Sequence, residues 1–330
     1  MALLELKDLH TFFRTKKGIV KAVNGVSYSV EAGRTLGVVG ESGSGKSVSA
    51  MSILQLLDGN GYIDSGEILF EGRDLTQLSE KEMYSVRGND ISVIFQEPMT
   101  SLNPVFTVSR QVSEPFIIHQ GMTKKQAAAK VIEMLADVKI PNPHIVAKQY
   151  PHQLSGGMRQ RVMIAMALAC KPKLLIADEP TTALDVTIQA QILKLMNDLK
   201  EEHGTSIIFI THDLGVIRQI ADDVAVMYCG QVVEMAPAGT IFMDAEFSHP
   251  YTEGLMNSIP RLSTPTHTRL DAIPGAVPHP LKLPKGCKFA PRCKYATERC
   301  LNEEPEMIHV SETQQVRCFY PRKEDQHGKK

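Results

Sequence analysis

Hydrophobic and polar positions follow regular periods along most of the chain. In residues 3–9 and 26–30 apolar side chains alternate with polar ones, which predicts half-buried β-strands. Residues 174–177 and 207–210 are continuous apolar runs, which is typical of strands buried on both faces. Apolar residues at helical spacing predict helices over residues 46–57, 124–135, 158–168 and 186–199. Short buried strands alternating with amphipathic helices predict an α/β fold around a parallel sheet.

The pattern becomes irregular near residue 247. Beyond that point prolines are frequent and neither period is sustained. We therefore expect an α/β domain over residues 1–245 and an appended proline-rich, irregular extension over residues 246–330. The longest unbroken apolar run, residues 162–170, is far shorter than the ~20 residues of a spanning helix. Acidic residues interrupt the first apolar positions, so no secretory signal is expected, and other chains would have to supply any membrane span.

Composition and charge narrow the possible partners. The chain is 43% hydrophobic and 22% charged, as in ordinary globular proteins, and its formal net charge is −1. A near-neutral chain has no overall field that attracts nucleic acid or an anionic membrane, so no nucleic-acid partner is expected. Because neither a spanning run nor a secretory signal is expected, the sequence predicts a cytoplasmic location.

Residues 40–47 form a phosphate-binding motif between a predicted strand and a predicted helix. The segment matches G-x-x-x-x-G-K-[S/T] and reads Gly40, Glu41, Ser42, Gly43, Ser44, Gly45, Lys46, Ser47. Glycines let the backbone point successive N–H groups at phosphate oxygens, and the helix adds the positive end of its dipole. Lys46 would reach the β- and γ-phosphates, and the Ser47 hydroxyl would ligate Mg²⁺. A glycine-rich loop with a chance lysine is the alternative, and the flanking strand and helix disfavour it.

Acidic residues follow the buried strand 174–177, at the edge where open α/β sheets hold ligands. Asp178 is the expected partner of Mg²⁺. Glu179 is the expected general base, a role that contributes ~10²–10⁴-fold in rate. The alternative is a purely structural role, in which the two acids cap the next helix. His212 follows the strand 207–210 at the same edge, where it could hydrogen-bond the γ-phosphate or serve only a structural role.

A second potential anion site opens the predicted helix 158–168. Ser155 is a good helix cap, and Gly156 and Gly157 expose N–H groups at the positive helix end. The segment could be a well-capped helix and nothing more. A monomer that already has a phosphate loop has no obvious use for a second anion site.

With these motifs on one chain, residues 1–245 resemble the ATP-binding-cassette (ABC) ATPases. The resemblance implies a P-loop NTPase fold, with a parallel sheet core, an antiparallel β subdomain and a helical subdomain. It also implies that two cassettes pair head to tail, so that the signature motif of one completes the ATP site of the other. The residues that match this signature are Leu154, Ser155, Gly156, Gly157 and Gln160.

The same resemblance assigns roles to further residues. Gln96 corresponds to the Q-loop glutamine, which touches Mg²⁺ and couples to membrane subunits. Asp185 belongs to the D-loop, and His212 is the switch histidine. An aromatic upstream of the phosphate loop stacks on adenine, and Phe13 is preferred to Phe12 for this role. ATP would then clamp two cassettes together, and hydrolysis through Glu179 would release them.

Nearly the whole chain resembles one branch of the family, the cassettes of dipeptide and oligopeptide importers. Residues 99–104, 249–252 and 286–293 carry this closer resemblance. It implies an ATP hydrolase that energises peptide import and lies peripherally on the cytoplasmic face of the membrane. The implied partners are a second ABC ATPase subunit, a distinct homologue, and two transmembrane permease subunits. An extracellular or periplasmic peptide-binding protein would act with them indirectly.

Four cysteines are clustered in the extension, at Cys287, Cys293, Cys300 and Cys318. Disulfides are unexpected in a reducing cytosol, so the cluster indicates either metal binding or plain thiols. The spacing C-x5-C-x6-C-x17-C lacks the tight pair usual for structural Zn²⁺, whereas iron–sulfur clusters tolerate varied spacing. Spacing alone leaves a cluster, Zn²⁺ and unligated thiols open. The family resemblance implies a [4Fe–4S] cluster, with Zn²⁺ as the alternative.

Two rival functions remain open on the sequence. The same motor could energise uptake of nickel or another small solute, because contacts with the cargo belong to other subunits. A soluble ABC ATPase acting on ribosomes or DNA is disfavoured by the single cassette, the absence of a heptad run and the near-neutral charge.

Overall fold

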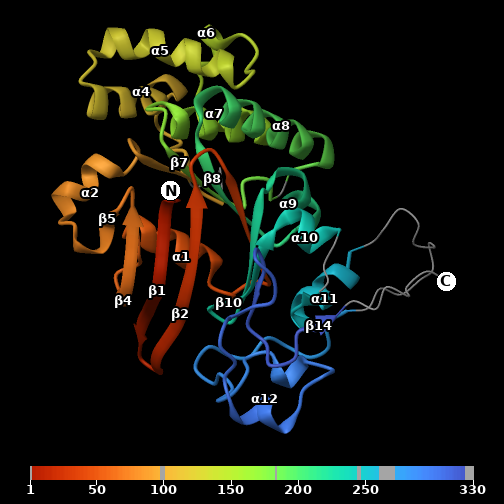
Figure 1. Ribbon diagram of the computed structural model, residues 1–330. Coiled ribbons are helices and arrows are strands. Elements are labelled where there is room, and N and C mark those ends of the chain that lie inside the picture. The colour runs from red at the N-terminus through yellow and green to blue at the C-terminus, as the bar shows by residue number, and fades with distance from the viewer. Residues whose placement is uncertain (1, 97–100, 183, 244–246, 260–271, 324–330) are drawn as a thin grey trace. The chain divides into compact units, whose positions relative to one another are not determined.

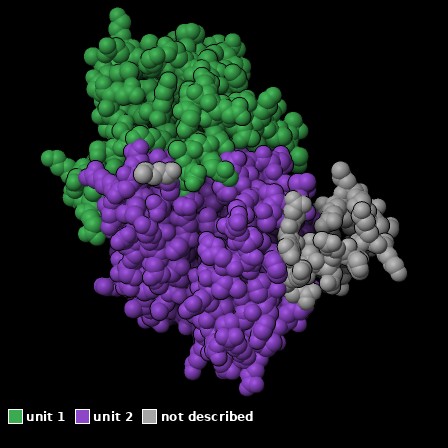
Figure 2. All heavy atoms as spheres, in the orientation of Figure 1, with its two compact units in different colours: residues 1, 30–34, 77–210 green, residues 2–29, 35–76, 211–330 purple. Residues whose placement is uncertain are grey.

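The computed structural model describes residues 2–96, 101–182, 184–243, 247–259 and 272–323 (Figure 1). The chain divides into two compact units, coloured separately in Figure 2. Unit 1 comprises residues 30–34 and 77–210, and unit 2 comprises residues 2–29, 35–76 and 211 onward. Among the described residues, no helix combines the length and the apolar character needed to cross a bilayer.

Unit 1 combines parallel strands with a group of helices. Its strands β6 (Ile91–Ile94), β7 (Leu174–Asp178) and β8 (Ser206–Thr211) pair in parallel, and every residue of β7 and β8 is buried. Its helices are α2 (Glu80–Val86), α4 (Val108–Gln120), α5 (Lys124–Asp137), α6 (Pro143–Val146), α7 (Gly156–Leu168) and α8 (Val186–His203), with a 3-10 turn η2 (Pro151–Gln153).

Local sequence explains where these helices begin and end. Thr123 and Gln126 form a reciprocal capping box at the start of α5. Helix α8 ends at Gly204, whose φ of 67° lies in the left-handed region that favours glycine. The predicted helices 124–135, 158–168 and 186–199 are confirmed.

Unit 2 contains an antiparallel sheet at the beginning of the chain. Its strands lie in the order β2–β1–β4–β5, and both β1/β4 and β4/β5 are antiparallel. Their bounds are β1 (Ala2–Thr15), β2 (Gly18–Glu31), β4 (Gly61–Phe70) and β5 (Arg73–Asp74), followed by the 3-10 turn η1 (Leu75–Gln77). The predicted strands 3–9 and 26–30 lie within β1 and β2.

Unit 2 also contains a mixed set of strands around the phosphate loop. Strand β3 (Thr35–Val39) pairs in parallel with β9 (Asp223–Tyr228), which pairs antiparallel with β10 (Gln231–Pro237). The extension adds β13 (Gln315–Val316) to β10, and β12 (Ile308–His309) to β13. A separate pair joins β11 (Phe247–Ser248) to β14 (Arg322–Lys323). The helices are α1 (Lys46–Ile53), α9 (Leu214–Ile220), α10 (Ala238–Phe242), α11 (Pro250–Asn257) and α12 (Glu298–Asn302), with a 3-10 turn η3 (Ala290–Arg292).

Helices α1 and α11 of unit 2 differ from the sequence prediction. The helix expected over 46–57 ends at Ile53, because Gln55 takes a left-handed backbone with φ of 52°. Helix α11 begins at Pro250, where no regular period was seen, because proline is well suited to a first helical turn. The proposed boundary at residue 245 stays a prediction, and residues 211 onward cluster with the phosphate loop in one unit.

Candidate nucleotide site

The phosphate-binding segment lies between β3 and α1 in unit 2. Strand β3 is buried throughout, and the chain leaves it at Gly40. Helix α1 begins at Lys46 after Gly45, and no side chain caps its N-terminus. A helix start without a side-chain cap, preceded by a glycine-rich turn, is suited to an anionic ligand.

Close packing of this loop requires glycine at two positions. A Cβ on Gly40 would lie 2.1 Å from the carbonyl oxygen of Met227, and one on Gly45 would lie 2.4 Å from that of Ala22. Their φ angles, 154° and 97°, are also in the region that favours glycine. The loop can therefore approach its neighbours closely only with glycine at both positions.

Polar groups inside the loop fit a phosphate ligand. The buried Lys46 Nζ donates to the carbonyl oxygens of Gly40 at 2.7 Å and Glu41 at 3.1 Å, so its ammonium lies within the curve of the loop. Ser44 Oγ is buried and has no hydrogen-bond partner within the described part of the chain. A buried hydroxyl in this position is satisfied when an oxygen-rich ligand enters the loop.

Phe12 and Phe13 have different surroundings. Phe13 lines a cavity of about 280 Å³ together with Gly43 and Gly45 of the phosphate loop. Phe12 is only 7% exposed and packs edge-on against Tyr62, with ring centroids 6.2 Å apart. Of these two aromatic residues, only Phe13 lines the cavity beside the phosphate loop. The extension also lines this cavity, through Pro278, Pro280 and Leu283.

His212 lies in the short turn between β8 and α9. Strand β8 ends at Thr211, and the side chain of Asp213 caps α9 by accepting from the N–H of Gly215 at 2.7 Å. His212 is exposed. The turn therefore presents an imidazole at the end of a buried strand.

Gln96 and Glu179 are in direct contact in unit 1. Gln96 Nε2 donates to Glu179 Oε2 at 3.1 Å, and Thr182 Oγ1 donates to the same oxygen at 2.9 Å. The backbone of Glu179 has φ of 46°, an unusual and costly value for a residue other than glycine. Its N–H donates to the carbonyl oxygen of Ile210 at 2.9 Å. A half-buried carboxylate is thus held in one orientation directly after a strand, next to the buried Asp178.

Asp178 and Glu179 do not cap the helix that follows them. The following helix, α8, is capped by Asp185, whose carboxylate accepts from the N–H of Ile188 at 2.9 Å. Two acids at the end of β7, one of them on a strained backbone, therefore have no role as caps.

The signature segment forms the exposed start of α7. Ser155 caps the helix by accepting from the N–H of Met158 at 3.3 Å, and Gly156 is exposed. A Cβ on Gly157 would lie 2.9 Å from Ile188, so glycine allows α7 to approach α8 closely here. Leu154 and Gln160 are buried, and Gln160 Nε2 has no hydrogen-bond partner in the described part of the chain.

The expected site residues are distributed over both units. Unit 2 carries the phosphate loop, Phe13 and His212, and unit 1 carries Gln96, Asp178, Glu179, the signature segment and Asp185. The contact between Gln96 and Glu179 brings together two residues that are far apart in sequence. Residues 99–100 of the closer family resemblance, and Ala183, two positions before Asp185, lie outside the described residues.

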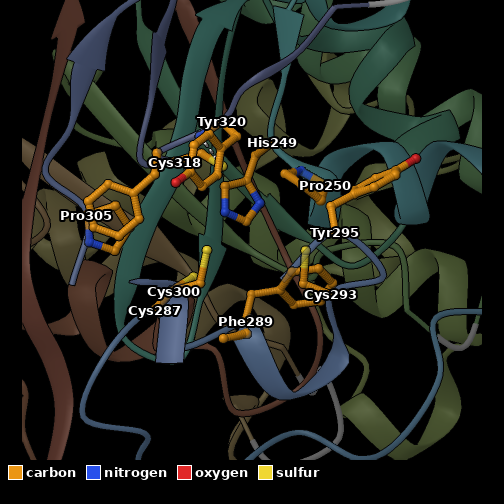
Figure 3. A pocket seen from close by; sticks show the side chains of 12 residues that line it. His249, Pro250, Cys287, Phe289, Cys293, Tyr295, Cys300, Pro305, Cys318 and Tyr320 are labelled. Atoms are coloured by element: carbon orange, nitrogen blue, oxygen red, sulfur yellow. Dashed lines mark hydrogen bonds between the residues drawn. The ribbon is translucent and has the colours of Figure 1, made fainter. Parts of the chain in front are cut away.

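The four cysteines of the extension line one cavity in unit 2, together with His249 (Figure 3). None of them forms a disulfide. Burial raises the pKa of the Cys287 and Cys293 thiols and raises that of Cys318 to about 11. Across the residues that the structure describes, no three His, Cys, Asp or Glu side chains are arranged to hold a metal ion. The described side chains therefore do not form a site for a single metal ion, and the expected Zn²⁺ and [4Fe–4S] sites stay predictions.

Sequence reasoning missed the residues of the extension that reach the phosphate loop. Tyr251 accepts a hydrogen bond from the Glu41 N–H, and Arg292 pairs with the Glu41 carboxylate. Tyr251 and Arg292 fall in segments that carry the closer family resemblance. Nothing in their spacing predicts contact with a residue that lies 210 and 251 positions earlier, respectively.

Comparisons with known proteins match two parts of this chain to known families. The family model "ABC transporter" matches residues 23–182, and the model "Oligopeptide/dipeptide transporter, C-terminal region" matches residues 233–300. The oligopeptide transport ATP-binding protein AppD of Bacillus subtilis is 52% identical over 318 residues, which covers 96% of each chain. The oligopeptide transport ATP-binding protein OppD of Salmonella typhimurium is 51% identical and covers 97% of this chain and 94% of its own.

A solved structure shows the same cassette fold. The dimeric ATP-binding cassette MJ0796, bound to ADP and Pi in a post-hydrolysis state, is 29% identical and has a TM-score of 0.64. The match covers 71% of this chain and 98% of MJ0796. Fold, motif order and relatives agree that the chain belongs to the ATP-binding proteins of ABC transporters.

Proposed function

We propose that the chain is the ATP-hydrolysing subunit that energises import of di- or oligopeptides through a membrane ABC transporter. The catalytic part of this proposal depends on one observation, the Glu179 carboxylate held by Gln96 and Thr182 at the end of β7. The peptide cargo is supported by two oligopeptide transport ATP-binding proteins that are about 50% identical to this chain over nearly its whole length. Nickel or another small solute remains the alternative cargo.

Each side chain of the site has a chemical role in this proposal. Lys46 binds the β- and γ-phosphates, while Phe13 stacks on adenine and His212 donates a hydrogen bond to the γ-phosphate. Ser47, Gln96 and Asp178 would hold Mg²⁺, which when bound neutralises part of the phosphate charge. Glu179 accepts a proton from the attacking water, and the hydrogen bonds from Gln96 and Thr182 orient its carboxylate for that step.

The signature segment is assigned to the ATP bound by a second cassette. Ser155, Gly156 and Gly157 at the exposed start of α7 offer a positive helix end to phosphate. Asp185 of the D-loop directly follows Leu184, whose side chain would lie 4.0 Å from a Cβ on Gly156. The partner in this proposal is a distinct homologous cassette. Two permease subunits and an external peptide-binding protein complete a complex in which this chain lies peripherally on the cytoplasmic face.

The extension is proposed as a cysteine-rich module over residues 246–330, appended to a cassette over residues 1–245. We further propose that Cys287, Cys293, Cys300 and Cys318 hold a [4Fe–4S] cluster. Support comes from the lining of one cavity by all four thiols and from the implied ligand set of the family. In such a cluster each thiolate binds a different iron, so the thiols need not converge on one ion.

Replacing Glu179 with Gln tests the catalytic proposal. Glutamine keeps the shape of the side chain but cannot accept the proton, so hydrolysis by the assembled transporter should fall by ~10²–10⁴-fold. Mg-ATP binding to the purified chain should stay within a few-fold of the unaltered protein. Unchanged turnover would rule out Glu179 as the base. Transport of labelled di- and oligopeptides, against labelled Ni²⁺, by the unaltered transporter then distinguishes the two cargoes.

A further inference from the structure

We propose that the extension holds the phosphate loop ready for ATP, through a neutralising ion pair between Arg292 and Glu41 and a hydrogen bond from Glu41 to Tyr251. Arg292 and Tyr251 are positioning residues in this proposal, because they would act through their contacts with Glu41 of the loop. The inference rests on the proposed function, since it assumes that residues 40–47 bind the phosphates of ATP.

Glu41 is an acid in a loop that binds a polyanion. It follows Gly40 directly, and its side chain is 31% exposed. An unneutralised carboxylate at this position would repel the incoming phosphates, and the repulsion is strongest where water is partly excluded. The loop therefore needs a cation close to Glu41 that does not occupy the phosphate site itself.

Arg292 supplies this cation from the extension. Its Nη1 donates to Glu41 Oε2 at 2.6 Å and its Nη2 donates to Oε1 at 3.0 Å, which is the bidentate geometry of a strong pair. The Arg292 side chain is 4% exposed. The hydrogen bond to Glu41 raises the pKa of Arg292 further above its already high value, so the charge is permanent.

Further contacts fix the orientation of the guanidinium. Its Nε donates to the carbonyl oxygen of Pro274 at 3.0 Å, and its Cζ lies 5.8 Å from the ring centroid of Tyr228. Because these contacts already fix the guanidinium, it loses little conformational entropy when it pairs with Glu41.

Tyr251 anchors the backbone of the same loop residue. Its hydroxyl accepts from the Glu41 N–H at 2.8 Å, and the side chain is fully buried. The centroid of its ring lies 4.7 Å from that of Tyr228 and 5.4 Å from that of Phe289. Phe289 also lines the four-cysteine cavity. Glu41, at the start of the phosphate loop, is thus held through its backbone by Tyr251 and through its side chain by Arg292. Tyr251 in turn packs against Phe289 of the four-cysteine cavity.

A double-mutant cycle on the full chain tests the neutralising role. Arg292→Met keeps the apolar stem and removes the charge, and we expect it to weaken Mg-ATP binding by about tenfold, as measured by isothermal titration calorimetry. In the Glu41→Gln background, where no carboxylate needs neutralising, the same substitution should change the Kd by less than about twofold. Rescue of this kind is not expected if Arg292 only stabilises the fold.

The chain offers a matched control and a second probe. Lys288 forms another partly buried ion pair of the extension, at 2.8 Å from Glu304 instead of the phosphate loop. Lys288→Met should therefore leave Mg-ATP affinity unchanged. Tyr251→Phe removes the acceptor for the Glu41 N–H and should weaken binding a few-fold. Thermal unfolding followed by circular dichroism checks that each variant is folded.

The possible outcomes separate this inference from the proposed function. If the unaltered chain does not bind Mg-ATP, the proposed function fails. If it binds, and folded Arg292→Met binds equally well, the positioning role is overturned. A loss that persists at full size in the Glu41→Gln background would show that Arg292 does not act by neutralising Glu41. If Arg292→Met does not fold, Tyr251→Phe and the double variant still decide the question.

Discussion

Phe12 and Phe13 are neighbours in β1 that the structure assigns to different tasks. Phe13 lines the cavity beside the phosphate loop, whereas Phe12 is buried against Tyr62. Base–aromatic stacking contributes ~1–3 kcal/mol, so Phe13→Ala should weaken Mg-ATP binding about tenfold with little change in stability. Phe12→Ala should instead lower the free energy of unfolding by about 3 kcal/mol. Calorimetric Kd values and urea unfolding curves measure both effects, and a reversed pattern would reassign adenine stacking to Phe12.

At the scale of single residues, sequence predicted the motifs but not the contacts between them. Residues 40–47 were identified because the pattern is contiguous and flanked by the right elements. Glu179 was placed by its position after a buried strand, but its left-handed backbone and its bond from Thr182 leave no trace in the sequence. Arg292 and Glu41 are 251 positions apart, and only the folded chain shows that they pair.

At the scale of elements, the start of α7 offers a test that separates stability from function. Gly156 is exposed, and a Cβ there would meet nothing closer than Leu184 at 4.0 Å. An acid in the first turn interacts favourably with the helix dipole, so Gly156→Asp should not destabilise the fold. The same charge would repel the phosphate of a second cassette, and hydrolysis by the assembled transporter should fall on the order of 100-fold.

A neutral variant of the same shape controls for size at this position. Gly156→Asn should keep most of the hydrolytic activity, whereas both variants should show unfolding midpoints close to that of the unaltered chain. Mg-ATP binding to the isolated chain should be normal in both. Equal activity of the Asp variant and the unaltered protein would contradict the assignment of α7 to a partner's nucleotide.

The sequence predicted helices and strands correctly where apolar residues recur at a regular spacing over many residues. It did not predict them where this spacing is interrupted or the element is very short. Helices α5, α7 and α8 have sustained apolar spacing, and strands β7 and β8 are continuous apolar runs. Helix α4 was not predicted, because Pro115 lies inside it. Strands β12 and β13 are two residues each, too short for any period. The pairing of β13 with β10 joins residues that are distant in sequence.

At the scale of the whole molecule, the extension is more closely joined to the nucleotide-binding part than its irregular sequence suggests. It adds β13 to β10, lines the cavity beside Phe13, and pairs Arg292 with the phosphate loop. An appended module was expected from the change in composition near residue 247. The sequence contains no signal for these attachments, because each depends on residues brought together by the fold.

We expect a bound metal to stabilise the proline-rich extension. A short segment with few long helices or strands buries little core, so a metal would contribute much of its stability. Purified without oxygen, the chain should contain about four irons and four sulfides, because each of the four cavity thiols would bind one iron. Cys318→Ser should lower this content and the unfolding midpoint. Cys170→Ser, in unit 1 and not among the residues that line the cavity, should preserve both. Stoichiometric zinc, or metal-free folded protein, would contradict the cluster and leave Arg292 and the added strands to hold the extension alone.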